Sequence, residues 1–424
     1  MGGRFRLVVL TGFLASVVAC APAHGAEPAP TEAAPPAEPA PPAEAAPPAP
    51  IPAPVGMTTE GSDFAAWSHV EPVLKSARAQ HGMPAMAAAV VFEGRPAVCA
   101  AVGNRRLGVE SPVTVDDKFH LGSCTKAMTA TLVQVLVDAG KLRWEETLAE
   151  VFPRLADAMH ESYRKVTLLQ LAAHRGGMPG KGATWPAGMT FRQVHDLPGP
   201  PREQRRVYVE KILAQGPAVE PGKQFLYSNA GYVVLGAACE ERMNVAYEAL
   251  MRLYIFEPLK MASAGFGPPG RAPEVDQPWP HRSRPTGLVP VEPGDLSDNP
   301  PAVSPGGRVH CSIGDWARFV GAHLDGARGR PTPLAVKDWN RLHEPPLGGT
   351  YALGWGTVPR RWAGGLALTH TGSNTMNFAV VWMAPKRDFA VMVATNAGGD
   401  EAPKACDEVA GNLIRAYRQW KGAP

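Results

Sequence analysis

Apolar runs of strand length lie near both ends of the 424-residue chain, and this arrangement restricts its possible folds more than any other feature. Near the start, residues 86–92 and 97–102 are separated by Glu93-Gly94-Arg95-Pro96, a spacer typical of a hairpin. Near the end, residues 378–383 and 389–395 are separated by a second turn-forming spacer. Hairpins this far apart in sequence can bury their apolar faces in one shared layer. We therefore predict a single antiparallel sheet made from both ends of the chain.

The middle of the chain, from residue 123 to about 324, is predicted to be mainly helical, with long loops. Residues 267–305 are especially rich in Pro and Gly, which is typical of a functional rim or lid, or else of a mobile surface excursion. The predicted fold class is α+β, an α/β sandwich in which terminal helices flank the sheet and a mainly helical lobe is inserted. The expected elements are helices over 64–80 (interrupted at Pro72), 127–139, 168–173 and 232–254, a strand over 351–357, and a C-terminal helix with Cys406, Val409, Leu413, Tyr417 and Trp420 at helical spacing.

The first residues have the features of an export signal. Arg4 and Arg6 precede an apolar run from Leu7 to Ala19, which is too short to span a bilayer comfortably. We predict a signal peptide over residues 1–26 and a protein that works outside the cytoplasm, in the periplasm or attached to a membrane.

Two processing sites fit this signal. Val17-Val18-Ala19-Cys20 resembles a bacterial lipobox and would make Cys20 the lipidated first residue of a lipoprotein, whereas the small residues Ala23–Ala26 offer ordinary cleavage. Residues 27–56 follow and consist almost entirely of Pro and Ala, a composition that favours extended polyproline II and cannot bury a core. They are predicted to be a disordered tether, or a spacer without a specific reach, ahead of a globular domain over 57–424.

Charge and composition exclude several classes of function. The chain has 42 basic and 39 acidic residues without basic blocks, so we expect no nucleic-acid partner. Its 12 histidines form no H-E-x-x-H motif, and the five cysteines after Cys20 show neither a CxxC pair nor metal-ligand spacing, so no metal or cofactor is expected. Most of these cysteines are predicted to be small buried side chains, with one oxidised pair as an alternative. No serine lies in the G-x-S-x-G elbow of α/β-hydrolases.

Ser123 and Lys126 form the S-x-x-K pattern at the start of a predicted helix. A serine in the first turn has backbone N–H groups and the positive end of the helix dipole beside it, which favours developing negative charge. Lys126 projects from the same face one turn later and can reach the Ser123 hydroxyl. Burial would lower the pKa of this lysine and make it a general base. The pattern is weak on its own, because a capping serine and a solvated lysine would read the same way.

Two further short elements strengthen this interpretation. Tyr227-Ser228-Asn229 follows a Pro-Gly turn and precedes a helix, so Tyr227 and Asn229 can point at one place. His370-Thr371-Gly372 leads into a strand, where alternation sends His370 and Gly372 to one side and Thr371 to the other.

S-C-T-K, Y-S-N and H-T-G, in this order and separation, resemble the three elements of serine β-lactamases and penicillin-binding proteins, S-x-x-K, S-D-N and K-T-G. The tyrosine form of the second element is similar to the branch of class C β-lactamases, D-alanyl-D-alanine carboxypeptidases and family VIII esterases. The likeness covers about residues 64–414, and it includes 166–171 leading to 174–179, 255–259 and 305–307.

This resemblance implies a serine hydrolase that forms an acyl-enzyme. Ser123 would attack the carbonyl, and Lys126 and Tyr227 would share the proton handling, with Tyr227 kept partly phenolate by nearby cations. Asn229 would hydrogen-bond Lys126 and the substrate, and the backbone N–H groups of Ser123 and Ser373 would form the oxyanion hole. The substrate would be a small molecule or a peptide, including the stem peptide of peptidoglycan, with membrane contact only through the N-terminal anchor.

The chain departs from the family pattern in its third element. His370 replaces the usual lysine, so the positive charge that would hold a substrate carboxylate is weakened or depends on pH. Residues 373–378 also contain less glycine than the corresponding segment of relatives. The predicted reaction is hydrolysis of an ester, an amide or a D-amino-acid peptide, like that of an esterase or a D-alanyl-D-alanine carboxypeptidase, with a class C-like β-lactamase as the alternative within the same machinery.

Some readings compete with this assignment. His120 and His174 fit a catalytic triad, but structural roles are favoured for both because Lys126 and Tyr227 are available as bases. Cys124 is predicted to point away from Ser123 and to pack. The alternative of another class is a catalytically silent protein that binds peptidoglycan or serves as a scaffold.

Overall fold

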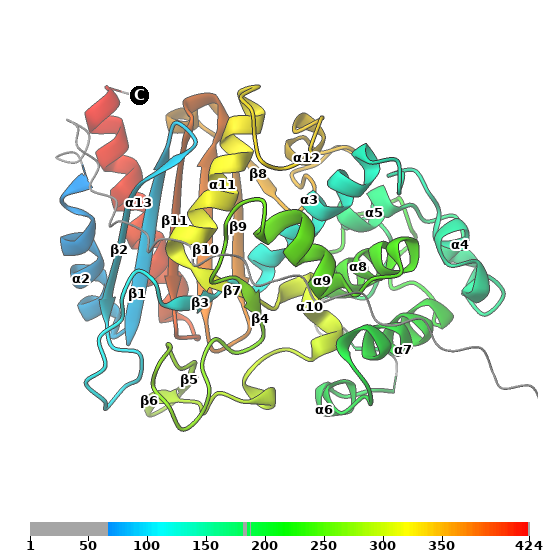
Figure 1. The fold of residues 1–424 in the computed structure, drawn as a ribbon, viewed down its shortest axis with the longest axis horizontal. Coiled ribbons are helices and arrows are strands. Elements are labelled where there is room, and N and C mark those ends of the chain that lie inside the picture. Colours follow the sequence, from blue (N-terminus) through cyan, green and yellow to red (C-terminus); the bar gives the residue numbers. More distant parts are fainter. Residues whose placement is uncertain (1–66, 181–184, 187, 423–424) are drawn as a thin grey trace, which may run out of the picture. The chain divides into compact units, whose positions relative to one another are not determined.

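Strands from both ends of the chain form one six-stranded antiparallel sheet, as predicted (Figure 1). The computed structural model describes residues 67–180, 185–186 and 188–422, so the predicted signal peptide, Cys20 and the tether lie outside the described residues. The strand order is β2-β1-β11-β10-β9-β8, and the central pairing of β1 with β11 places Val90 opposite Val391. The strands are β1 (Ala85–Phe92), β2 (Arg95–Gly103), β8 (Gly356–Arg360), β9 (Gly365–Ser373), β10 (Phe378–Ala384) and β11 (Phe389–Thr395).

The turn between β1 and β2 shows why the first hairpin forms. Its central residues, Glu93 and Gly94, have φ of 51° and 73°. Two consecutive positive φ angles match the right-handed twist of paired strands, and glycine takes such an angle without steric cost.

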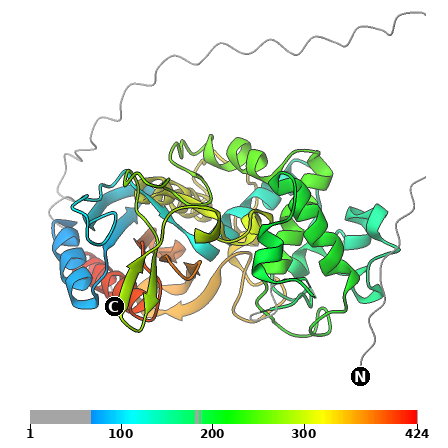
Figure 2. The ribbon, with the colours of Figure 1, turned by 90° about the horizontal axis from the view of Figure 1, so that it is seen from below.

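The two terminal helices, α2 (Val70–His81) and α13 (Glu401–Lys421), cover one face of the sheet, and α11 (Ile313–Ala327) covers the other (Figures 1 and 2). Val70, Leu413 and Val393 belong to the apolar cluster between the terminal helices and the sheet. The predicted interruption at Pro72 was wrong, because α2 begins at Val70 and Pro72 falls in its first turn, where a missing N–H costs nothing.

The inserted lobe is mainly helical, and its apolar core is continuous with the core on the α11 side of the sheet. The predicted helix over 232–254 is instead two helices and a π-helical turn. The first ends at Met243, because the capping residue Asn244 adopts a left-handed φ of 53°. The helices of the lobe and its surroundings are α3 (Thr125–Asp138), α4 (Leu148–Val151), α5 (Leu168–Ala172), α6 (Phe191–His195), α7 (Pro201–Ala214), α8 (Asn229–Met243), α9 (Tyr247–Met251), the π-helical turn η4 (Arg252–Phe256), α10 (Ser304–Gly307) and α12 (Asn340–His343).

Short strands connect the lobe to the sheet and were not predicted. β3 (Lys118–His120), β7 (Val309–Ser312) and β4 (Gly265–Phe266) form a three-stranded sheet. The Pro/Gly-rich segment 267–305 contains a hairpin of β5 (His281–Arg284) and β6 (Gly287–Pro290) and two 3₁₀ turns, so it is more ordered than predicted.

Two further sequence-based expectations have clear outcomes. The strand expected over 351–357 begins only at Gly356, and Tyr351 pairs with it through an isolated bridge. The five cysteines among the described residues are free thiols, four of them buried, so the alternative of an oxidised pair was wrong for this part of the chain. None of the helices within the described ranges is long and apolar enough to cross a membrane.

Candidate active site

Ser123 and Lys126 lie where a short 3₁₀ turn passes into α3. The turn η1 spans Gly122–Cys124, and α3 begins at Thr125, so Lys126 projects from the first turn of the helix towards Ser123. Nζ of Lys126 lies 3.0 Å from Oγ of Ser123. Ser123 is partly exposed, whereas the lysine side chain is fully buried. The structure therefore brings these two residues together as the S-x-x-K spacing predicts.

Two carbonyl oxygens fix the position of the Lys126 amine. Nζ lies 2.7 Å from Oδ1 of Asn229 and 2.6 Å from the carbonyl oxygen of Gly306. Carbonyl oxygens only accept hydrogen bonds, so they occupy both N–H groups of a neutral amine and leave its lone pair for the Ser123 hydroxyl. Burial lowers the pKa of Lys126 to about 7, which makes this neutral state accessible near neutral pH.

Asn229 is held in place by the start of α8. Ser228 precedes the helix, and its Oγ accepts the backbone N–H of Gly231 at 3.2 Å while donating to the carbonyl oxygen of Pro179 at 2.6 Å. The serine of the second element is thus a helix cap. The cap fixes the first turn of α8, from which Asn229 reaches Lys126.

Tyr227 lies beside the lysine as an uncharged phenol. Nζ of Lys126 is 4.9 Å from the centre of the Tyr227 ring. Burial raises the pKa of Tyr227 well above its usual range, although a hydrogen bond with the side chain of Ser123 acts in the opposite direction. The predicted phenolate was therefore wrong, because loss of hydration is the largest influence on the Tyr227 pKa and opposes ionisation.

The third element lies at the end of β9, and its side chains alternate as predicted. His370 and Gly372 are buried, whereas Thr371 and Ser373 are exposed. Nε2 of His370 lies 3.0 Å from the hydroxyl of Tyr351, and Nδ1 lies 2.6 Å from the carbonyl oxygen of Thr371.

His370 is a neutral histidine. Burial, together with the nearby Lys126, lowers the pKa of His370 to about 3. The expectation that His370 titrates near neutral pH was wrong, because both ring nitrogens are engaged away from water.

The backbones of η1 and β9 touch without intervening side chains. A β-carbon on Gly372 would lie 1.9 Å from the carbonyl oxygen of Leu121 and 2.7 Å from the backbone nitrogen of Ser123. A β-carbon on Gly122 would lie 2.3 Å from the backbone nitrogen of Ser373. Glycine at both positions therefore permits the two backbone N–H groups that the resemblance assigns to an oxyanion hole to lie next to each other.

His174 contacts the Tyr227 segment on both sides. Its carbonyl oxygen accepts the N–H of Leu226 at 2.8 Å, and its Nδ1 accepts the N–H of Ser228 at 3.1 Å. Its ring centre is 4.3 Å from that of Tyr227. His174 has φ of 55°, a left-handed conformation that is uncommon outside glycine. This geometry supports the structural role that was favoured for His174 and adds a specific partner.

Sequence reasoning missed Gly306 and Tyr351 as parts of the site. Gly306 contributes only a carbonyl oxygen, which leaves no side-chain signal. Tyr351 lies in a loop and reaches His370 only through the tertiary fold. Cys124 is buried, with its thiol 3.6 Å from the carbonyl oxygen of His370, in agreement with its predicted packing role.

Comparisons with known proteins identify the family and agree with the fold. Penicillin-binding protein 4 of Amycolatopsis lactamdurans is 28% identical over 360 residues, which cover 79% of this chain and 86% of that protein. A β-lactamase of Escherichia coli (strain K12) is 28% identical over 246 residues, or 58% of each chain, so the match spans less than two thirds of that relative. The octameric penicillin-binding protein homologue from Pyrococcus abyssi has a similar fold, with a TM-score of 0.65 at 20% identity over 84% of this chain and 77% of that one.

The family model described as Beta-lactamase matches residues 70–413, a range that contains the whole sheet, the helical lobe and all three short elements. The chain therefore belongs to the Beta-lactamase family, within the superfamily of serine β-lactamases and penicillin-binding proteins.

Proposed function

We propose that this chain is an exported serine hydrolase that acts through an acyl-enzyme on an ester, an amide or a D-amino-acid peptide, with Ser123 as the nucleophile. The position of the Lys126 amine is the main support. Two carbonyl acceptors use its N–H groups, and Ser123 Oγ lies 3.0 Å from its nitrogen. This is the arrangement of a general base next to a hydroxyl nucleophile.

In the acylation step, Oγ of Ser123 forms a bond to the substrate carbonyl carbon while its proton passes to Nζ of Lys126. The carbonyl oxygen becomes an oxyanion, stabilised by the backbone N–H groups of Ser123 and Ser373. When this intermediate collapses, the bond to the leaving group breaks, and the leaving group takes a proton from the Tyr227 phenol, which Lys126 re-protonates. Lys126 is then neutral again, and the acyl group remains on Ser123.

In the deacylation step, water attacks the acyl carbon and gives up a proton to the same Lys126–Tyr227 pair. The ester bond to Ser123 breaks, and the pair returns the proton to Oγ. Tyr227 acts here as a proton relay and not as a standing phenolate, since burial holds its proton on the oxygen.

The third element supports a substrate without a carboxylate at the position that the usual lysine would contact. His370 is neutral and bonded to Tyr351 and to the backbone, so it offers no positive charge to a β-lactam or to a free C-terminal carboxylate. An ester, or a D-amino-acid peptide cleaved at an internal bond, fits this chemistry better. β-Lactam hydrolysis is the second candidate, supported by the E. coli relative.

The proposed location is outside the cytoplasm. It is supported by the charged and apolar pattern of residues 1–26 and by the lipobox-like Cys20, with residues 27–56 as a tether. An anchored enzyme could reach the stem peptides of peptidoglycan, which are then its natural substrate.

Covalent labelling tests the proposal. Wild type, Ser123→Ala and Cys124→Ala are treated with a fluorescent fluorophosphonate and a fluorescent penicillin, and the modified residue is located by peptide mass spectrometry. We expect the label on Ser123 in wild type, its loss in Ser123→Ala, and its retention in Cys124→Ala, because burial raises the pKa of the Cys124 thiol. Labelling of Ser123→Ala at the wild-type rate would refute the assignment. A panel of p-nitrophenyl esters, a chromogenic cephalosporin and a D-alanyl-D-alanine peptide then ranks the substrates.

A further inference from the structure

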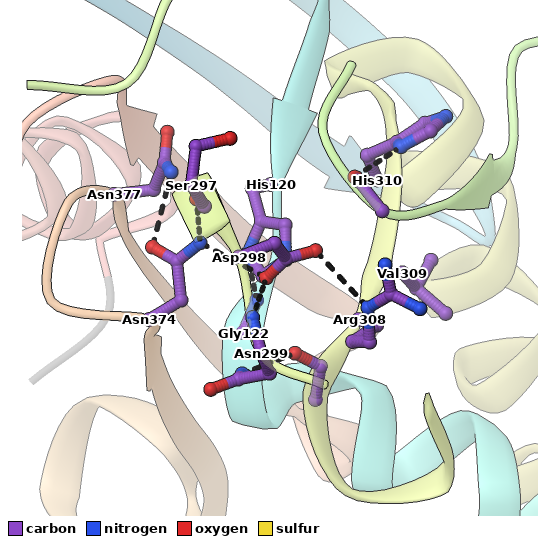
Figure 3. A network of polar contacts seen from close by, with 12 residues as sticks. His120, Gly122, Ser297, Asp298, Asn299, Arg308, Val309, His310, Asn374 and Asn377 are labelled. Atoms are coloured by element: carbon purple, nitrogen blue, oxygen red, sulfur yellow. Dashed lines mark hydrogen bonds and ion pairs between the residues drawn. The ribbon is translucent and has the colours of Figure 1, made fainter. Parts of the chain in front are cut away.

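A fully buried carboxylate, Asp298, joins the two backbone segments that meet at the active site (Figure 3). It belongs to the Pro/Gly-rich segment and follows the 3₁₀ turn η5 (Asp295–Ser297). Its oxygens contact side chains from three other parts of the chain, namely His120, Arg308 and Asn374. Arg308 compensates the charge, with Nε 3.3 Å from Oδ2.

The first arm of this network runs to the Ser123 turn. Nε2 of His120 lies 2.9 Å from Oδ1 of Asp298, and Nδ1 of His120 accepts the backbone N–H of Gly122 at 3.1 Å. Because Nδ1 accepts this N–H, Nε2 is left as the ring nitrogen that carries a proton, and it is the nitrogen in close contact with the carboxylate. The carboxylate is thus in contact with the ring whose other nitrogen holds Gly122, the residue before Ser123.

The second arm runs to the end of β9. Nδ2 of Asn374 donates to Oδ1 of Asp298 at 3.1 Å, and Oδ1 of Asn374 accepts the backbone N–H of Met376 at 3.2 Å and the amide of Asn377 at 3.0 Å. Asn374 is buried and directly follows Ser373. The amide of Asn374 therefore ties the loop that follows Ser373 to Asp298 through its nitrogen and holds Met376 and Asn377 through its oxygen.

The two arms end next to the proposed oxyanion donors. One arm ends one residue before Ser123, and the other ends one residue after Ser373, while both start from the same carboxylate oxygen. The segments also touch directly, since Gly122 leaves no room for a β-carbon beside Ser373. Direct contact sets how closely the segments approach, and the network restrains their movement along and away from each other.

We propose that Asp298 is a positioning residue that sets the two backbone N–H donors of the oxyanion hole relative to each other through His120 and Asn374. This inference rests on the proposed function, in which those N–H groups stabilise the tetrahedral intermediate. Donors that act on a developing charge must be fixed before the reaction, and a displacement of about 1 Å costs on the order of 100-fold in rate.

Asp298→Asn tests the inference, because an amide retains the shape but lacks the charge and the second acceptor oxygen with which the carboxylate contacts His120, Arg308 and Asn374 together. The probes are p-nitrophenyl butyrate and its thionoester, whose sulfur is a poor hydrogen-bond acceptor, and the acylation rate of each is measured. We expect the acylation rate for the oxygen ester to fall about 100-fold. The ester-to-thionoester ratio, the rate for the oxygen ester divided by the rate for the thionoester, should fall at least about tenfold, with KM little changed.

Asp388→Asn is the matched control. Asp388 is also buried and paired with an arginine, Arg330, with Oδ1 2.7 Å from Nη2. It lies in the turn between β10 and β11, at the opposite end of β10 from Ser373. Asparagine tolerates its left-handed φ of 55°. We expect Asp388→Asn to leave both the rate and the ester-to-thionoester ratio at wild-type values.

Folding of each variant is checked by its thermal transition. If Asp298→Asn has lost that transition, Asn374→Ala replaces it, because this change removes only the second arm and should lower the same ratio. A wild-type ratio in the folded variant, with or without a slower rate, overturns the inference. Failure of the fluorophosphonate to label Ser123 in wild type would instead refute the proposed function, so the two failures are distinguishable.

Discussion

The ionisation of Lys126 controls the proposed chemistry. Burial lowers the pKa of its amine from the ordinary 10.5 to about 7. Below that pH the amine is protonated and cannot accept the Ser123 proton; above it the amine is neutral. The second-order rate of fluorophosphonate labelling should therefore rise with pH through a limb near 7 and then level off. A rate that is constant between about pH 5 and 9 would show that Lys126 is not the base.

Asn229→Asp tests the same assignment with a designed pKa shift. Oδ1 of Asn229 lies 2.7 Å from Nζ of Lys126, so a carboxylate there favours the ammonium form and raises the lysine pKa by about one to three units. The limb of the labelling profile should move to higher pH by a similar amount. Asn412→Asp, at a half-buried position of α13, is the control and should leave the limb in place. An unmoved limb in Asn229→Asp would contradict the assignment.

His174 offers a test of how Tyr227 is held. Its carbonyl oxygen and its Nδ1 accept backbone N–H groups from the residues directly before and after Tyr227. His174→Asn retains an acceptor close to the Nδ1 position and tolerates the left-handed backbone, whereas His174→Gln places its amide near Nε2. We expect the Asn variant to keep most of its kcat and the Gln variant to lose at least about tenfold, with KM little changed. Equal kcat values, measured on a p-nitrophenyl ester, would argue against a role for this hydrogen bond.

At the scale of the element, the packing of β9 against η1 is the contact on which the site depends. Gly372→Ala places a methyl group on the backbone of Leu121 and Ser123, which cannot move as a flexible side chain could. We expect activity to fall by about 100-fold or more as the strand shifts. Gly411→Ala is the control, because it lies within α13 with its nearest neighbour 3.7 Å from the new methyl, and it should stabilise the helix by up to about 1 kcal/mol. Wild-type turnover in Gly372→Ala would show that this close approach is not needed.

Long apolar elements were predictable from sequence, and short ones were not. The strand at 389–395 was predicted with its observed bounds, because its alternating faces are both buried and its residues are uniformly apolar. β4 has only two residues, and β3 has three, so neither carries a periodicity. Their pairing with β7 depends on contacts that form only in the folded chain.

The residues of the site also fall into those that the sequence identified and those that it did not. The pairing of Ser123 with Lys126 was predicted from local spacing and the contact of Asn229 with Lys126 from the family resemblance, and the structure brings all three together. Gly306 and Asp298 were not, because a backbone carbonyl leaves no side-chain pattern and a single Asp in a Pro/Gly-rich loop resembles a turn residue. The phenolate predicted for Tyr227 and the titration near neutral pH predicted for His370 were wrong, since burial, which decides both, is a property of the tertiary fold, whereas the predicted loss of a fixed positive charge at His370 holds.

At the scale of the whole molecule, the chain must join its two ends to complete the site. β1 pairs with β11, and the sheet that results carries β9, which holds His370 and Ser373. Ser123, Lys126 and Asn229 lie on elements that follow β3 or belong to the inserted lobe. The site therefore forms only when the sheet and the lobe are both folded, and one apolar cluster runs through both of them.

This continuity predicts a single unfolding transition, which two buried substitutions in different places can test. Leu413 is fully buried between α13 and the sheet, and Leu413→Ala leaves a cavity there. Arg205 is fully buried in the lobe, where its guanidinium lies 2.8 Å from Glu240 and 3.0 Å from Glu248, so Arg205→Met leaves carboxylates without their cation. Each change should lower the free energy of unfolding by about 3 kcal/mol.

If the sheet and the lobe unfold together, each variant moves the same transition, whichever part it alters. In guanidinium chloride, the far-UV circular dichroism and the fraction of protein that still labels with fluorophosphonate should then change at one midpoint, shifted to lower denaturant by similar amounts in both variants and with an unchanged m-value. Arg205→Met should not lose labelling at a lower denaturant concentration than it loses helical signal. Two separate midpoints in either variant would show that the lobe and the sheet unfold independently, and that the shared core does not couple them.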